Sequence, residues 1–188
     1  MEEKKQIKLV KEKRKWFQIM SPKIFGGRVI GETLGETIDN LKGRKIEVSA
    51  GVVTGDMKKQ FVSLIFKVIG GDNNGANTDI EGLIVSQSYL KRGMRRFRGK
   101  LENSFMVKSV EGNVRIKVLL LLRNKIHRSI GSKLLKTVVE ISNKFVEGKK
   151  FEDLINTILN DSFNRAIKDG LKKTYPVADV EIRYFCKD

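Results

Sequence analysis

Cysteine, proline and histidine are scarce in this sequence, and each shortage excludes a class of protein. A single cysteine, Cys186, cannot form an intramolecular disulfide, so the composition excludes a disulfide-stapled scaffold and is typical of a reducing, cytosolic setting. Two prolines exclude a proline-rich linker protein. One cysteine and one histidine, His127, cannot complete a four-ligand zinc site.

Long hydrophobic runs are also missing. The longest uninterrupted run, Val118 to Leu122, has the length of a strand, whereas a membrane-crossing helix needs about 20 apolar residues. The first residues, MEEKKQIKLVKEKRK, lack the apolar core of a secretory signal. The sequence therefore predicts a soluble cytoplasmic protein without a membrane partner. Its 188 residues, 40% of them hydrophobic, are enough for one packed domain.

Acidic residues are absent from two stretches in which basic residues are frequent. Residues 91–100 contain six Lys or Arg and residues 113–136 contain seven, with no Asp or Glu in either stretch. Residues 1–15 contain seven cations and three anions. The three windows together carry +17, and the net charge of the chain is +16, which leaves −1 (16 − 17) for all other residues. Because a surface that is only soluble mixes both signs, this distribution indicates a polyanionic partner.

Aromatic residues make up only 7% of the chain, yet two of the basic segments contain them. Phe97 stands in RRFR, and Trp16 and Phe17 follow KRK. Arginine forks suit phosphates and aromatic rings suit unstacked bases, so the pattern favours structured or single-stranded RNA. The alternative is that these aromatic side chains only anchor the basic segments to the core. For Phe97 both interpretations stay open: it is either inserted in the core or stacked on a base.

The first acid-free stretch also has helical spacing. Arg92, Arg95 and Arg96 fall on one helical face, where they can meet a single RNA backbone. We predict that Tyr89 and Leu90 position this phosphate-binding surface. The candidate RNA-binding residues come from the basic windows and their flanks. They are Lys11, Lys13, Arg14, Lys15, Trp16, Lys23, Arg44, Lys91, Arg92, Arg95, Arg96, Arg98, Lys100, Arg115, Lys117, Arg123, Lys125, His127 and Arg128.

Hydrophobic periodicity changes along the chain from strand-like to helix-like. The expected strands are 16–20, 45–53, 61–69, 80–86, 101–109, 114–122 and 180–186. The expected helical segments are 37–41, 86–94, 134–146 and 151–167, and the glycine-rich stretch from 25 to 36 is predicted as loop and turn. The segment GGDNNGAN, with its turn composition, predicts a long hairpin with a flexible tip between the third and fourth strands.

This order of elements predicts an α+β domain. We expect a mixed or antiparallel sheet, or a partly closed barrel, with two C-terminal helices packed on it. Residues 16–188 would form this single RNA-binding domain. Residues 1–15 would form a basic, extended arm that is disordered in the free protein, because high charge is combined with weak apolar periodicity.

Catalytic groups have little support in the sequence. His127 stands near Lys125 and Arg128, which is typical of a basic surface rather than of a general base. Cys186 occupies an apolar strand position, where a buried small side chain is expected rather than a nucleophile. No phosphate-binding GxxxxGK[ST] loop is present. The sequence therefore predicts neither enzymatic activity nor a cofactor.

Six stretches of the sequence resemble one known family, in the same order along nearly the whole chain. They are KRKWFQIMSPKIFGG with the following IGET, LKGRKIEVS, SYLKRGMRR, VEGNVRIKV, FEDLI and YPVADVEIR. The family is the archaeal and eukaryotic small-subunit ribosomal protein family S-three-a-e, named S-one-e in the unified nomenclature. The short C-terminus after VEIRYFCKD resembles archaeal members.

The resemblance implies a structural protein on the platform of the small ribosomal subunit, near the messenger exit and the 3′ end of the small-subunit ribosomal RNA. It implies ribosomal RNA and neighbouring platform proteins as partners, with messenger RNA near the exit as a further candidate. It implies no cofactor.

Two other functions stay open on the residues alone. One is a free-standing nucleic-acid-binding module, such as a chaperone or regulator. The other is a metal-dependent nuclease that uses Asp72, Asp79 and Glu81, although the spacing of these acids fails the calcium-loop pattern and favours a hairpin tip.

Overall fold

The computed structural model describes residues 14–72, 75–94 and 99–188. The strands in these ranges are β1 (Lys15–Met20), β2 (Val29–Gly35), β3 (Lys45–Ser49), β4 (Val62–Asp72), β5 (Gly75–Val85), β6 (Gly99–Ser109), β7 (Gly112–Leu122) and β8 (Asp179–Lys187). The α-helices are α1 (Ala50–Thr54), α2 (Gln87–Met94), α3 (Arg128–Val146), α4 (Phe151–Leu159) and α5 (Ser162–Leu171). Short 3-10 turns are η1 (Lys23–Phe25), η2 (Asp39–Leu41) and η3 (Met57–Lys59).

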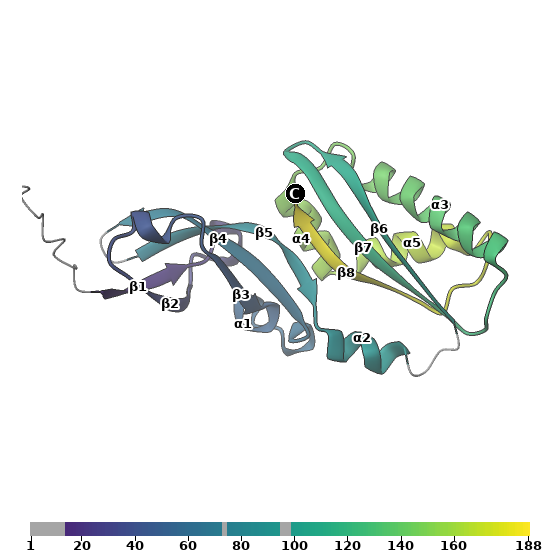
Figure 1. Ribbon diagram of the computed structural model, residues 1–188, viewed down its shortest axis with the longest axis horizontal. Helices are drawn as coiled ribbons and strands as arrows, with labels where there is room; N and C mark the ends of the chain where they lie inside the picture. Colours follow the sequence, from purple (N-terminus) through teal and green to yellow (C-terminus); the bar gives the residue numbers. More distant parts are fainter. Residues whose placement is uncertain (1–13, 73–74, 95–98) are drawn as a thin grey trace, which may run out of the picture.

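Strand β5 joins the two parts of the sheet. Residues 75–77 pair in parallel with β1, and residues 82–84 pair antiparallel with β8. Along its length β5 also pairs antiparallel with β4. Strand β3 adds to β4 and β2 to β1, while β8, β7 and β6 follow in order on the other side. The sheet is mixed and is not closed into a barrel (Figure 1), which confirms the predicted α+β class.

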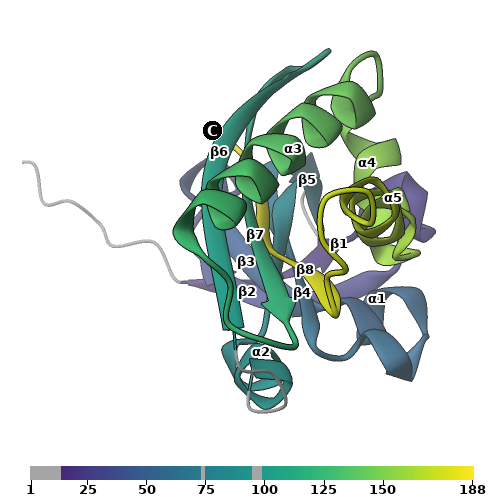
Figure 2. The ribbon, with the colours of Figure 1, turned by 90° about the vertical axis from the view of Figure 1, so that its right-hand side faces the viewer.

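The helices α3, α4 and α5 lie together over one face of β6, β7 and β8 (Figures 1 and 2). The rings of Phe145 and Phe163 stack at a centroid distance of 4.6 Å between α3 and α5. The rings of Phe151 and Phe185 stack at 5.5 Å between α4 and β8. The apolar periodicity of these helices therefore serves packing on the sheet, and the main core runs from here to β4 and β5.

The C-terminal region contains three helices where the sequence predicts two. The single helix predicted over 151–167 is broken between α4 and α5, because Asp161 adopts a left-handed backbone with φ 57°. The apolar pattern continues across the break because Ile158 and Leu159 before it and Phe163 after it are all buried in the same core. Periodicity alone therefore does not reveal this turn.

In the first 60 residues, two further predicted elements differ from those in the structure. The stretch predicted as loop contains β2, whose residues, Gly31 among them, form a strand by pairing with β1. The strand predicted over 45–53 ends at Ser49, and α1 follows. Ala50 and Val53 are buried with the helical spacing of three residues, while Val52 is 68% exposed. In both places tertiary contacts override the local pattern.

The start of the chain has its own small core. Phe17, Leu41, Val68 and Ala76 are buried together in the part formed by β1, η2, β4 and β5. Strand β1 begins at Lys15, one residue before the predicted start. Residues 1–13 of the predicted arm, residues 73–74 of the predicted hairpin tip and residues 95–98 lie outside the described residues. The other residues of the segment predicted as the tip, 70–72 and 75–77, belong to the strands β4 and β5.

The junction between β5 and β8 leaves no room for a side chain at Gly82. A Cβ at this position would overlap Sγ of Cys186 and lie 2.6 Å from the carbonyl oxygen of Phe185.

We predict that Gly82→Ala lowers the free energy of unfolding by about 1–3 kcal/mol. Gly31→Ala in β2, where a Cβ meets nothing within 4 Å, is the control, and it should be neutral or stabilising by up to about 1 kcal/mol. Urea denaturation of both variants measures this, and equal stabilities would contradict the described junction.

Candidate nucleic-acid interface

The register of β6 and β7 brings two basic segments to one place. The two strands pair without a shift from Ser109 opposite Gly112 to Gly99 opposite Leu122. Gly99 and Leu122 therefore stand opposite each other at the end of the hairpin, and the backbone that follows Leu122 passes close to Gly99. An added Cβ on Gly99 would lie 2.8 Å from the carbonyl oxygen of Asn124, which shows how closely the two backbones approach.

Helix α2 is docked at the same end of the hairpin. Leu90 is buried in the main core, and Tyr89 packs against that core. Gly93 faces Leu121, because an added Cβ would lie 3.5 Å from its side chain. Lys91 and Arg92 are exposed. The buried side of α2 thus fixes the helix on the sheet and leaves its cations in solvent.

Arg92 is held in place by two aromatic rings. Its guanidinium carbon lies 5.3 Å from the ring centroid of Phe61 and 5.5 Å from that of Tyr89. The two rings are themselves stacked at 5.0 Å with 23° between their planes. A guanidinium bound to rings through its face keeps its N–H edge available for a planar oxyanion. Arg92 is therefore oriented for a phosphate.

The connection from β7 to α3 supplies the second basic segment. Arg123, Lys125, His127 and Arg128 are all exposed there. Helix α3 begins at Arg128 with His127 as its N-cap, and it has neither a side-chain cap nor an acidic residue in its first turn. The free N–H groups of this 19-residue helix add partial positive charge to the cations around them.

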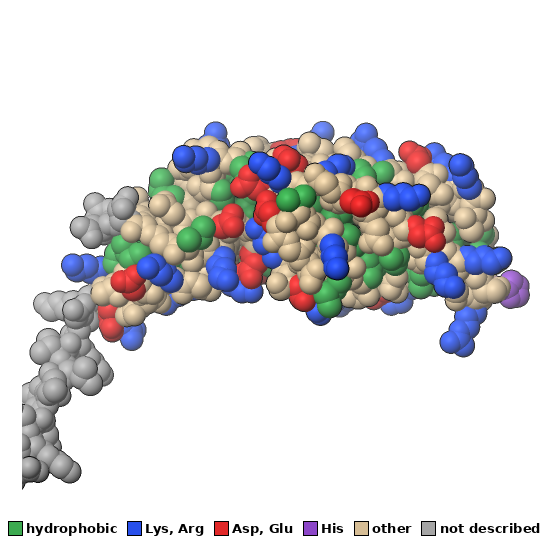
Figure 3. Space-filling view, turned by 90° about the horizontal axis from the view of Figure 1, so that it is seen from above, with side chains coloured by type: hydrophobic (Ala, Val, Ile, Leu, Met, Phe, Trp, Pro, Cys, Tyr) green, Lys and Arg blue, Asp and Glu red, His purple; other side chains and the backbone are tan. Residues whose placement is uncertain are grey.

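We call this surface the basic end of the molecule. It consists of Lys91, Arg92, Lys100, Arg123, Lys125, His127 and Arg128. Figure 3 shows Lys and Arg side chains gathered around the histidine at the end of the molecule away from β1. The acid Glu102 reaches this region, and its Oε1 lies 3.4 Å from Nζ of Lys100.

Other predicted site residues lie elsewhere or outside the described ranges. Arg115 and Lys117 are half-buried on β7, away from the basic end. Arg115 pairs with Asp188 at 3.0 Å, and Nζ of Lys117 lies 4.8 Å from the ring centroid of Tyr184. These two cations therefore have partners within the chain. Outside the described residues are Lys11, Lys13, Arg95, Arg96, Phe97 and Arg98.

A further group of predicted residues lies at the β1 end. It consists of Arg14, Lys15, Trp16, Lys23 and Arg44, all of them exposed. Arg44 donates to Oγ1 of Thr33 at 2.6 Å and to the carbonyl oxygen of Leu34 at 3.1 Å, so it links the start of β3 to β2.

The two aromatic residues of β1 have opposite surroundings. Phe17 is 5% exposed and belongs to the small core, whereas Trp16 is 68% exposed. Anchoring to the core therefore accounts for Phe17 and does not account for Trp16. Cys186 is buried, as the sequence predicts, and burial raises the pKa of its thiol.

Two exposed lysines on α3 are missing from the candidate residues. Lys133 and Lys136 lie on this helix, which begins at the basic end. They belong to the same acid-free stretch as Arg123 and Arg128. The absence of acidic residues from this stretch was thus a signal that could have added both lysines to the candidate RNA-binding residues.

The acids Asp79 and Glu81, which the nuclease alternative requires, are engaged in ion pairs. Oδ2 of Asp79 lies 3.7 Å from Nζ of Lys187, and Oε1 of Glu81 lies 2.6 Å from Nζ of Lys45. No group of three or more metal-ligating side chains occurs among the described residues. Within the same ranges, no helix combines the length and hydrophobicity of a bilayer-spanning segment.

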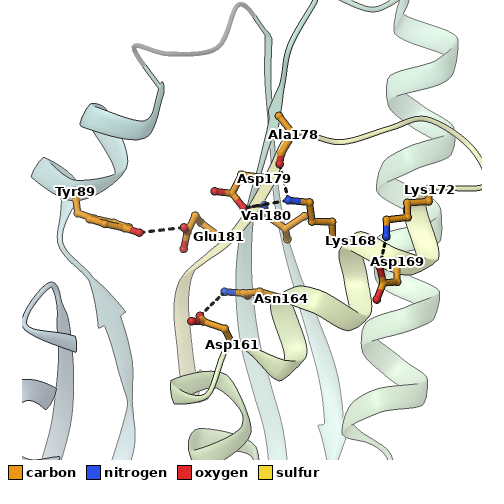
Figure 4. Close-up of polar contacts among 10 residues, drawn as sticks. All are labelled: Tyr89, Asp161, Asn164, Lys168, Asp169, Lys172, Ala178, Asp179, Val180 and Glu181. Atoms are coloured by element: carbon orange, nitrogen blue, oxygen red, sulfur yellow. Dashed lines mark hydrogen bonds and ion pairs between the residues drawn. The ribbon is translucent and has the colours of Figure 1, made fainter. Parts of the chain in front are cut away.

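Behind α2, Tyr89 contacts a carboxyl group on β8. The hydroxyl of Tyr89 donates to Oε1 of Glu181 at 3.4 Å (Figure 4), in a cleft of about 450 Å³ that α5 lines on its other side. Burial, and then the nearby carboxylates of Asp179 and Asp161, raise the pKa of Glu181 to about 7. The neighbouring cation Lys168 lies 3.8 Å from Asp179 and donates to the carbonyl oxygen of Ala178. At neutral pH Glu181 is thus a mixture of protonated and ionised forms.

We predict that Glu181→Gln changes how stability depends on pH. The pKa of Glu181 is about 7 in the folded state, against 4.5 for an unperturbed glutamate in the unfolded chain, so folding takes up a proton between these values. Wild-type stability should therefore lose a contribution as pH rises from about 4.5 through 7. The glutamine variant cannot ionise, and above pH 7 it should be more stable than wild type by up to about 3 kcal/mol.

The measurement is urea denaturation at several pH values from about 4.5 to about 8, which span the range over which this carboxyl titrates. The control is Glu140→Gln on the exposed face of α3, which removes a carboxylate that is not buried. A difference for Glu181→Gln that does not vary with pH would show that the pKa of this carboxyl is not raised in the folded protein.

The fold and the basic end together define a class: α+β proteins that carry a concentrated cationic surface. The chain matches the model of the Ribosomal S3Ae family over residues 2–185, and it belongs to that family. This is the family that the sequence motifs indicate, so the resemblance is confirmed.

Two archaeal relatives are similar over most of the chain. The small ribosomal subunit protein eS1 of Nanoarchaeum equitans is 33% identical over 178 residues, which are 92% of this chain and 88% of the relative. The small ribosomal subunit protein eS1 of Saccharolobus solfataricus is 31% identical over 170 residues, which are 90% of this chain and 82% of the relative. Because the family is one of ribosomal structural proteins, membership supports the expectation that the chain is not an enzyme.

Proposed function

We propose that this chain is a structural component of the small ribosomal subunit in the cytoplasm and binds ribosomal RNA through its basic end. Membership in the Ribosomal S3Ae family supports the ribosomal role, as do the names of the archaeal relatives. Its partners are then small-subunit ribosomal RNA and neighbouring ribosomal proteins.

The location within the subunit is the finer part of the proposal. The resemblance to the family supports a place on the platform near the messenger exit and the 3′ end of the small-subunit RNA, where messenger RNA is a further candidate partner. Residues 16–188 would form the RNA-binding domain. Residues 1–15, with Lys11 and Lys13, would add a basic arm.

The observation that carries the RNA-binding proposal is the meeting of two acid-free segments at one end of a hairpin. Lys91 and Arg92 belong to α2, whereas Arg123 follows β7 and Arg128 is the first residue of α3. Segments far apart in sequence thus present their charges together. Like charges at this density repel one another, and phosphates of a bound RNA would relieve that repulsion.

The first test is sedimentation, which separates a ribosomal protein from a free-standing nucleic-acid-binding module. Tagged protein in a cell lysate should migrate with small subunits on a sucrose gradient at moderate salt. A chain that stays near the top of the gradient, with subunits intact, would favour the free-standing module and contradict a structural role on the ribosome.

The second test concerns the basic end itself. We predict that the triple variant Arg92→Gln, Arg123→Gln and Arg128→Gln binds small-subunit RNA more weakly. It should also flatten the slope of log affinity against log salt concentration by about 2–3 units, at roughly 0.7–0.9 per lost phosphate contact. The melting temperature should change little, because exposed charges contribute little to stability.

A matched control removes three charges at the opposite end of the same hairpin. Lys108, Lys144 and Lys150 are exposed near the turn between β6 and β7 and the start of α4. Their replacement by glutamine lowers the net charge by the same amount, so it corrects for loss of overall charge. Equal slopes for the two triple variants would mean that the basic end is only a solvated surface.

A further inference from the structure

Trp16 is exposed on a strand whose other face is buried. On β1, Phe17 is 5% and Ile19 is 2% exposed, whereas Trp16 on the outer face is 68% exposed. The basic end does not include this residue, since β1 lies at the opposite end of the molecule (Figure 1). A large, flat apolar side chain held in solvent on a rigid strand indicates a binding surface.

Trp16 is one of the residues that line an open groove of about 930 Å³. The groove is lined by β1, by the segment that leads into η2 and by the end of β4, where Ile69 is 61% exposed. Gly70 and Gly71 line it without side chains. At this end of the molecule, Figure 3 shows hydrophobic side chains exposed among Lys and Arg side chains. The groove is thus lined by the exposed apolar side chains of Trp16 and Ile69 and by two glycines.

The charges around the groove fall into two kinds. Arg14 lies 3.9 Å from Glu36, and Lys42 lies 2.6 Å from Asp39, so these acids are neutralised locally. Lys15 lines the groove, and Lys67 stands two residues before Ile69 in the adjoining groove that shares Ile69 and Lys42. Neither Lys15 nor Lys67 forms an ion pair with any residue that the structure describes.

We propose that Trp16 is a stacking platform for an unpaired base of single-stranded RNA, with the adjacent phosphates on Lys15 and Lys67. A base offers a flat face to the indole and needs no charge in the groove, while its backbone brings negative charge to the two lysines. An apolar protein segment would fill the groove and bring no negative charge to them. The proposal rests on the proposed RNA-binding function, and it places a second contact at the end of the molecule opposite the basic end.

The chain has only one tryptophan, so its fluorescence reports directly on this site. The purified full chain is titrated with a single-stranded oligoadenylate and, separately, with an RNA duplex of the same length. Stacking should quench the indole emission and protect it from iodide with the single strand and not with the duplex. In the free protein, iodide should quench the emission freely.

Variants of Trp16 separate stacking from simple burial. Trp16→Ala should weaken binding of the single strand roughly tenfold, within the range measured for base–aromatic contacts, whereas Trp16→Phe should stay within about threefold of wild type. The salt slope should be unchanged in both variants because neither loses a phosphate contact. Lys15→Gln with Lys67→Gln should instead flatten the slope by about 1.4 units.

Several outcomes would overturn the proposal. These are an indole already shielded from iodide in the free protein, emission that the single strand leaves unchanged, and equal affinity of wild type and Trp16→Ala. Protection of Trp16 only when ribosomal proteins are added would assign the groove to a protein partner instead. None of these results depends on the triple variant of the basic end, so the proposed function can stand while this inference fails.

Discussion

The unbroken antiparallel register of β6 and β7 is the constraint on which the candidate interface depends. Eleven consecutive residue pairs, from Ser109 opposite Gly112 to Gly99 opposite Leu122, fix the two ends of the hairpin relative to each other. A slip of one residue would turn every side chain of the strand to the other face. It would bury Lys117 and expose its apolar neighbours, and it would separate Gly99 from Asn124. The register therefore decides both what is buried on β7 and where the basic segments meet.

The basic residues have different surroundings at the two ends of this hairpin. Near the turn, Arg115 pairs with Asp188, and Nζ of Lys187 lies 3.0 Å from Glu111. The hydrogen bond from Lys187 is the main reason that the pKa of Glu111 lies below its usual value. At the open end, most cations face solvent, and Arg92 is held by aromatic faces instead of a carboxylate. Exposed lysines also occur near the turn, where Lys108, Lys144 and Lys150 lie, so the two ends differ in the number of nearby acids and not in the presence of exposed cations. The phosphates of the proposed RNA partner would offset the positive charge of the open end.

The parts of the fold that follow from local pattern could be predicted from the sequence. The turn composition of GGDNNGAN correctly indicated the β4–β5 hairpin, although both strands extend into this segment, and the alternation in Val114–Leu122 correctly indicated the strand β7. The strand β2 could not be found in this way, because its glycines resemble a loop until β1 pairs with them. The break at Asp161 was equally hidden, since a left-handed residue between two buried faces leaves the apolar spacing intact.

The sequence shows which segments are rich in basic residues, but it does not show where the fold places them. Acid-free stretches directed attention to Arg92, Arg123 and Arg128, and the structure brings these three residues together at the basic end. A count of charges also selected Arg115 and Lys117. Both are half-buried on β7 and have partners within the chain, Asp188 for Arg115 and Tyr184 on β8 for Lys117, and a count of charges does not reveal these partners. Nor could it show that the exposed aromatic is Trp16 while Phe17 is buried, since that depends on which face of β1 meets the small core.

We propose that RNA contacts the open end of the β6–β7 hairpin and not its turn. Differential acetylation of lysines in the free protein and in intact small subunits tests it most directly. We expect that Lys91, Lys100 and Lys125 at the open end lose reactivity on assembly, and that Lys108 and Lys144 near the turn keep theirs. Protection confined to the lysines near the turn, with those of the basic end still reactive, would contradict it.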